Sequence, residues 1–119
     1  MEKINLKEKL EQFQEQWNPK IIGELDGMQI KIAKLKGEFD WHSHENEDEM
    51  FLVLKGQLQI RFRDREERLK EGEMIIIPKG VEHLPIAGEE VHVMLIEKAT
   101  TVNTGNLRND RTRNNLERI

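Results

Sequence analysis

With 119 residues, the chain is long enough to bury one hydrophobic core and too short for two domains of ordinary size. It has no cysteine, which excludes disulfides, thiolate metal sites and thiol chemistry. The net charge of −4 creates no strong field for a polyanion, and no apolar run approaches the roughly 18 residues that span a bilayer. We therefore expect a cytoplasmic protein that binds neither nucleic acid nor a membrane.

The first segment has the pattern of an amphipathic helix. Asn5 and Glu8 are spaced as a capping box at its start. Apolar residues follow at helical spacing, namely Leu6, Leu10, Phe13 and Trp17. Asn18-Pro19 ends the pattern, because proline disfavours helical geometry in the residue before it. We expect residues 1–19 to form an N-terminal helix packed on the main body, with a dimer-forming arm as the alternative.

From residue 20 onward the pattern is that of short strands separated by glycine-containing turns. The expected strands include residues 28–32, 50–54, 58–63, 74–77 and 91–95. Short strands at close intervals predict an all-β antiparallel barrel or sandwich over residues 20–99. Residues 100–119 differ, because they are rich in Asn and Arg and poor in apolar side chains. Such a polar C-terminal tail is either loosely ordered or laid on a partner.

Three of the four histidines and one glutamate form a candidate metal site: His42, His44, Glu49 and His83. Residues two apart on a strand share a face, so the imidazoles of the His-Ser-His segment can converge on one ion. Glu49 lies at an odd offset and joins them only if the intervening polar residues turn. His83 arrives from a distant segment, aimed by the rigid Pro78-x-Gly80 loop before it. Imidazole and carboxylate ligands suit Fe, Mn, Ni or Zn, and the ligand types alone do not rank these metals.

Other residues near this set have more ordinary interpretations. Ser43 is the single serine, and on a strand it points away from both flanking imidazoles, which argues against a serine hydrolase. His92 is either pocket lining, supporting a metal ligand, or a satisfied core histidine. Phe39 and Trp41 are expected to form wall or core rather than to stack on a substrate. Glu82 is a candidate acid or base only because it neighbours His83 in the sequence.

The same residues resemble the two sequence motifs of the cupin superfamily, in its small single-domain form of the cupin 2 conserved-barrel type. The first motif is similar to Gly37, His42, His44, Glu49 and Gly56, and the second to Gly72, Pro78, Gly80 and His83. Two departures occur: the gap before His42 is one residue shorter than usual, and Ala87 replaces the asparagine that ends the second motif. The resemblance implies a jelly-roll-like antiparallel barrel whose metal is held by the three histidines and Glu49.

The resemblance also implies a class of function. We expect a metal-dependent enzyme, an oxygenase or an isomerase, that acts on a small chelating organic or sugar-like substrate. Glu49 would be a metal ligand and a proton acceptor. The alternative is a metal-containing cupin module that binds or senses a small ligand without turnover. A homodimer is expected in either case.

Overall fold

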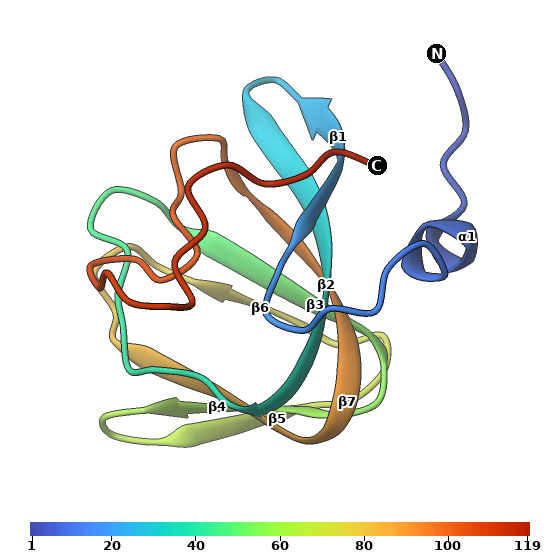
Figure 1. Ribbon diagram of the computed structural model, residues 1–119. Helices are drawn as coiled ribbons and strands as arrows, with labels where there is room; N and C mark the ends of the chain where they lie inside the picture. The colour runs from blue at the N-terminus through green and yellow to red at the C-terminus, as the bar shows by residue number, and fades with distance from the viewer.

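Antiparallel strands are the main secondary structure of the chain, which a computed structural model describes over residues 1–119 (Figure 1). In chain order the elements are α1 (Leu6–Leu10), β1 (Lys20–Leu25), β2 (Met28–Glu38), β3 (Glu49–Lys55), β4 (Leu58–Phe62), β5 (Glu66–Leu69), β6 (Met74–Ile77) and β7 (His83–Lys98). The strands pair in the order β1-β2-β7-β3-β6, and β4 lies between β5 and β7. This arrangement confirms the predicted all-β antiparallel barrel with a short N-terminal helix. No helix has the length and apolarity required to cross a membrane.

The long strand β7 joins the two halves of the barrel. Its first residues pair with β4, with His83 opposite Phe62, and its last residues pair with β3, with Glu97 opposite Glu49. Strand β2 pairs along the other edge of β7. Alternate residues of β7 therefore face the interior, where a cluster of buried apolar side chains forms the core: Ala33, Leu35, Phe51, Val53, Leu58, Ile60, Leu69, Ile77, Ala87, Val91, Val93 and Leu95.

Helix α1 is shorter than its sequence pattern predicts, because it ends at Leu10 and the chain then runs extended over the outside of β2. A continued helix would join the carbonyl of Phe13 to the amide of Trp17. Instead the Lys34 Nζ donates to the Phe13 carbonyl at 2.7 Å, and the Trp17 amide donates to the Lys34 carbonyl at 2.9 Å. Phe13 is buried in a second, smaller apolar cluster outside the barrel. Tertiary contacts with one lysine therefore replace the last helical turns.

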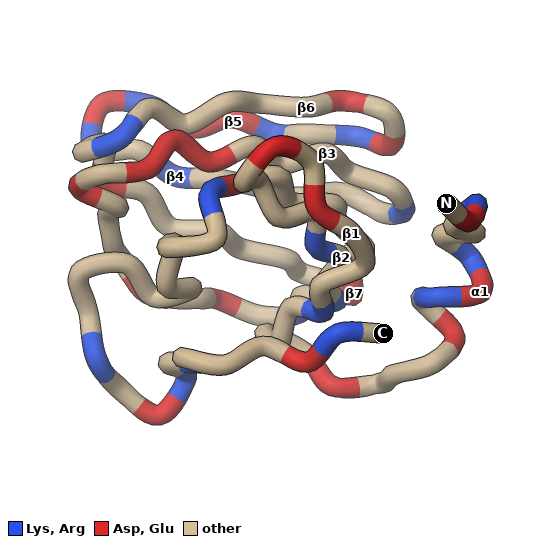
Figure 2. Tube along the Cα trace, turned by 90° about the horizontal axis from the view of Figure 1, so that it is seen from above, with Lys and Arg blue, Asp and Glu red and all other residues tan.

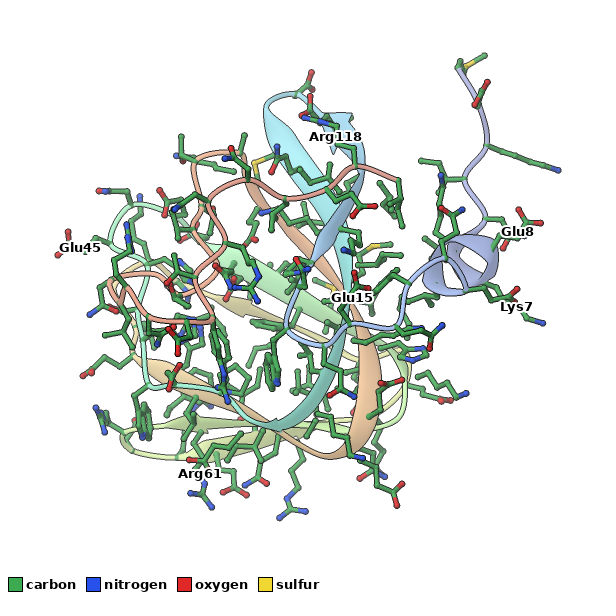
Figure 3. All side chains as sticks on the ribbon, in the orientation of Figure 1. Lys7, Glu8, Glu15, Glu45, Arg61 and Arg118 are labelled. Atoms are coloured by element: carbon green, nitrogen blue, oxygen red, sulfur yellow. The ribbon has the colours of Figure 1, made fainter.

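Strand β5 had no signal in the sequence, because three of its four residues are charged. It pairs with β4 and carries Glu66 opposite Arg61, whose side chain projects outward from the barrel (Figure 3). The basic residues of this region thus form a solvated outer face. Both charge signs are mixed along helix α1 and along the C-terminal segment as well (Figure 2).

Residues 100–119 fold back across the open end of the barrel (Figure 1). Asn106 is joined to Ser43 by two hydrogen bonds, one from its amide to the Ser43 carbonyl and one from the Ser43 amide to its side-chain oxygen, each 3.0 Å. At the very end, the Ile119 amide donates to the Ile21 carbonyl at 3.0 Å. The polar tail is thereby ordered against its own barrel. We call residues 103–113 the strap.

Candidate metal centre

A short backbone ladder brings the two histidine segments together. His42 and His83 exchange both amide-to-carbonyl hydrogen bonds, at 3.1 and 2.9 Å, and form an isolated antiparallel bridge. The Gly80 amide adds a third bond, to the His44 carbonyl, at 2.8 Å. A further bond, from the Lys79 amide to the Asp48 carboxylate at 2.9 Å, ties the proline loop to the acidic turn. These backbone hydrogen bonds hold the imidazoles of His42, His44 and His83 next to one another.

Glu49 is the first residue of β3, and its side chain lies beside the three imidazoles. It occupies the inner face of that strand, in register with Ile77 of β6 and Glu97 of β7. Its carboxylate oxygens lie 3.2 Å from the His83 Nε2 and 3.5 Å from the His44 Nε2. The turn predicted between His44 and Glu49 therefore does bring the carboxylate beside the rings. One ligand atom from each of the four residues lies within 4.8 Å of the others, and all four side chains are buried.

The hydrogen bonding of the three rings tests whether this cluster suits a metal. The Nδ1 atoms of His42 and His83 each lie 2.9 Å from a backbone carbonyl, of Asp40 and Val81 respectively. Such bonds make Nδ1 the donor and leave Nε2 with its lone pair toward the cluster. His44 has two buried ring nitrogens without a hydrogen-bond partner. Because a buried polar atom without a partner is costly, the donor set fits a bound cation.

Burial and charge also set the protonation of the cluster. Burial, followed by the positive charge that His83 can carry, lowers the pKa of His42 from 6.5 to about 4. Its ring is thus neutral at pH 7, as a metal ligand must be. Burial alone would raise the pKa of Glu49, but the close contacts of its carboxylate with the His44 and His83 rings outweigh burial and hold that pKa well below 4.5. The cluster therefore contains a neutral His42 ring and an ionised Glu49 carboxylate at pH 7.

A buried ion pair beside Glu49 was not predicted from the sequence. Lys31 Nζ lies 2.8 Å from Glu97 Oε1, and both side chains are at most 3% exposed. Burial and the adjacent Glu49 charge raise the pKa of Glu97 well above 4.5, against the opposing effect of Lys31. The alternation of residues 28–32 predicts a strand with Met28, Ile30 and Ile32 buried and the polar residues exposed. In the structure, Lys31 on the polar face is also buried, because it points into the barrel beside Glu97.

Several residues near the cluster in sequence lie elsewhere in space. His92 is on the outer face of β7, where its Nε2 lies 3.1 Å from Glu90, so it neither supports a ligand nor lines the site. Glu82 is half exposed and paired with Arg63 at 3.1 Å, which removes it as a candidate acid or base. Trp41 stacks under the same arginine, at 3.9 Å from the ring centroid. Glu45 of the acidic turn projects away from the barrel (Figure 3).

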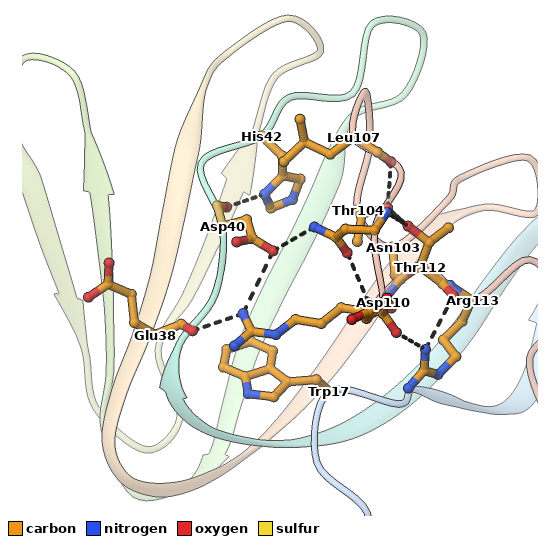
Figure 4. Close-up of polar contacts among 12 residues, drawn as sticks. Trp17, Glu38, Asp40, His42, Asn103, Thr104, Leu107, Asp110, Thr112 and Arg113 are labelled. Atoms are coloured by element: carbon orange, nitrogen blue, oxygen red, sulfur yellow. Dashed lines mark hydrogen bonds and ion pairs between the residues drawn. The ribbon is translucent and has the colours of Figure 1, made fainter.

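The strap lies beside Asp40 and His42 at the end of the barrel (Figure 4). Asn109 donates to the Asp40 carboxylate at 3.0 Å, and Arg111 donates to the Glu38 carbonyl at 2.9 Å. Gly105 has a φ of +58° and lies so close that a Cβ there would be 2.1 Å from the Ser43 carbonyl oxygen and 3.1 Å from the His42 ring. Only glycine fits this position. The sequence predicted neither the contact between Gly105 and Ser43 nor the packing of the strap over this end of the barrel.

Comparisons with known proteins agree with this description. A family model described as the cupin domain matches residues 30–97. A cupin-2 domain containing protein from Shewanella frigidimarina is 48% identical, with a TM-score of 0.79 over 80% of this chain and 93% of that one. Protein NMB1881 from Neisseria meningitidis is 35% identical, with a TM-score of 0.76 over 82% of this chain and 100% of that one.

A curated relative, the uncharacterised protein YdbB of Bacillus subtilis, is 43% identical over 63 residues, which are 52% of this chain and 56% of YdbB. The match thus spans about half the length of that relative. The family model covers more than half of the chain and includes His42, His44, Glu49 and His83. The chain therefore belongs to the cupin family, as its motifs predicted.

Proposed function

We propose that this cupin is a metal-dependent enzyme that holds one divalent transition metal, Fe, Mn, Ni or Zn, through His42, His44, Glu49 and His83. One observation carries the proposal: four buried residues place ligand atoms within 4.8 Å of one another, and one of them, His44, has two ring nitrogens without a hydrogen-bond partner. A cation at the centre would satisfy those atoms.

A metal held by these three imidazoles and one carboxylate would supply Lewis acidity toward an oxygen atom of a ligand. The chain's own residues orient the donor atoms. The carbonyls of Asp40 and Val81 orient the rings of His42 and His83. Glu49 would be a metal ligand, and its carboxylate would also accept a proton from a substrate carbon or hydroxyl. The strap limits access of water from the mouth.

The reaction that fits this arrangement is an oxygenation or an isomerisation of a small molecule that chelates through two oxygens. The alternative is a cupin that binds or senses such a molecule without turnover. The cavity described below accommodates a ligand in either case. The two functions differ in one measurable respect, which is whether product forms.

The test uses protein freed of metal and reloaded separately with Fe²⁺, Mn²⁺, Ni²⁺ and Zn²⁺. Each form is mixed with diketones, α-hydroxy acids and aldoses, while oxygen uptake is followed by electrode and product by NMR. Turnover by the wild type, abolished in His44→Ala and retained in His92→Ala, is the expected result. Ligand binding without product in all four metal forms would replace the enzyme with the binding module.

We also propose that the chain acts in the cytoplasm as a homodimer. Met50 and Leu52 of β3 and Met74 and Ile76 of β6 form an apolar patch on the outer face of the sheet. The adjoining apolar side chains of β2 and β7 are covered by the N-terminal segment, where Phe13 packs on Ile32. Met74 and Ile76 are 52% and 59% exposed, and their strand, β6, pairs only with β3. An uncharged patch beside a free strand edge is self-complementary about a two-fold axis. Light scattering should give a dimer for the wild type and a monomer for Ile76→Lys, and a monomeric wild type would refute this.

A further inference from the structure

A small cavity, partly open to solvent, lies against the metal cluster, with His42 and Glu49 among its lining residues. Its volume is ≈ 40 Å³, which is about the space of three water molecules. The remaining walls come from three parts of the chain: Trp17 of the N-terminal segment, the barrel strands, and Asn103 of the strap. Figure 4 shows Trp17, His42 and Asn103 gathered at this end of the barrel.

The cavity walls are largely apolar and aromatic. Trp17 and Phe39 stack with ring centroids 4.7 Å apart, and Phe39 meets the His42 ring edge-on at 5.3 Å. Leu35 and Leu95 complete the apolar lining from β2 and β7. A ligand that reaches the metal must therefore bury its body against hydrocarbon and aromatic faces, which favours carbon over charged oxygen.

No lysine or arginine lines this cavity. Arg111 lies over the Phe39 ring at 5.4 Å, but its guanidinium donates to the Glu38 carbonyl. The side-chain amide of Asn103 is also occupied, because it donates to the Arg111 carbonyl and accepts from the Arg113 amide, each at 2.8 Å. Apart from the metal, nothing in the lining can neutralise an anionic group.

One polar atom in the lining has no partner. Glu97 binds Lys31 through Oε1, whereas its Oε2 is buried without a hydrogen bond. Glu97 lines the cavity next to Glu49. This oxygen can meet a single polar group of a ligand, and its carboxyl group disfavours a second negative charge beside it.

We infer that this site takes a small chelator with two oxygen donors, an apolar body of a few carbon atoms, and no charged group beyond its chelating atoms. Short-chain 1,3-dicarbonyl compounds and their enols belong to this class, whereas sugar phosphates, uronates and dicarboxylates do not. The inference rests on the proposed metal centre, because the metal supplies the anchoring of the two oxygens. It narrows the substrate range from chelating acids and sugars to chelators with an apolar body and no charge away from the two chelating oxygens.

The experiment compares two ligands of equal size on the Zn²⁺-loaded full chain, since Zn²⁺ does not quench fluorescence. Pentane-2,4-dione and malonate both chelate through two oxygens, but malonate places carboxylate oxygens where the dione places methyl groups. Calorimetric affinities are divided by the affinity of the same ligand for free Zn²⁺. We expect the dione to be favoured by about ten-fold or more, because burying two methyl groups alone gives that factor.

Fluorescence locates the ligand, with a matched pair of variants. Trp17 lines the cavity, whereas Trp41 lies under Arg63 outside it. The dione should change the emission of Trp41→Phe as it does in the wild type, and should have little effect on Trp17→Phe. A bulky analogue, 2,2,6,6-tetramethylheptane-3,5-dione, should bind at least about ten-fold more weakly, because its tert-butyl groups exceed the cavity.

Three outcomes overturn the inference while leaving the metal centre intact: malonate binds as well as the dione, the bulky dione binds as well as the small one, or no ligand binds protein that retains Zn²⁺. Failure of Zn²⁺ itself to bind is a different result. It would refute the proposed function, and the calorimetric titration with Zn²⁺ alone, carried out first, distinguishes the two.

Discussion

Acidification of the metal-free protein should reveal the burial of His42. Its pKa is about 4 in the folded protein and 6.5 in an unfolded chain. Between these values the unfolded chain holds a proton on this ring that the folded protein lacks, so the free energy of unfolding rises with pH. The His42 contribution is fully present above pH 6.5 and is lost by about pH 4. The roughly 2.5 pH units between the two values correspond to roughly 3 kcal/mol.

The neighbouring carboxyl group acts with the opposite sign. The pKa of Glu97 is raised well above 4.5, so the folded protein keeps a proton that the unfolded chain releases, and stability falls as the pH rises above 4.5. Both the wild type and His42→Asn contain Glu97, so most of its contribution to the pH dependence cancels in the difference between their stabilities. Urea denaturation of both proteins, in chelator and at pH 7.5, 6.5, 5.5, 4.5 and 4.0, measures the difference by linear extrapolation.

The stability difference between the two proteins should shrink by roughly 3 kcal/mol from pH 7.5 to about pH 4. The His42→Asn change also removes ring contacts, but that loss is independent of pH and only offsets the two curves. If the curves of wild type and variant run parallel over the whole range, His42 is not held neutral by burial, and our description of the cluster's protonation is incorrect.

Three further predictions concern the surroundings of the site. Lys31→Met should cost about 3–5 kcal/mol in chemical denaturation, because it leaves Glu97 buried without its partner; Lys31→Met/Glu97→Leu should recover most of the loss, and an equally unstable double variant would contradict this. Gly105→Ala should cost about 1–3 kcal/mol and expose the strap to proteolysis, since its Cβ would lie 2.1 Å from the Ser43 oxygen; unchanged protease resistance would show that the strap is not held there. Phe13→Ala should cost about 3–5 kcal/mol in the same assay, and a cost below about 1 kcal/mol would mean that the N-terminal segment does not stabilise the barrel.

The barrel and the four clustered residues could be predicted because their signals are local. Strand alternation and the proline and glycine turns set the strands, and the spacing of two between His42 and His44 fixes their common face. The position of Glu49 required only a turn after His44. The helix length could not be predicted in the same way, because Lys34, far away in the sequence, takes the hydrogen bonds that would have continued it.

The missed features all depend on pairing between distant segments. Strand β5 is charged and exists because β4 offers it an edge. The sequence pattern predicted that Lys31 lies on the solvent-exposed face of its strand. It is buried instead, because it pairs with Glu97 in the last strand. The tail carried too few apolar residues to predict its position, since backbone and amide contacts such as those of Asn106 hold it in place. Neither composition nor periodicity records such contacts.

Metal content is the most direct test of the central claim, that three imidazoles and one carboxylate hold a single ion. Protein purified without chelator is analysed by mass spectrometry for metals, then stripped and titrated with Zn²⁺, as wild type, His44→Ala and His92→Ala. We predict about one ion per chain for the wild type and for His92→Ala, and a sharp loss of binding for His44→Ala. A wild type that neither carries nor rebinds a metal, or a His44→Ala protein that binds it equally well, would contradict the account.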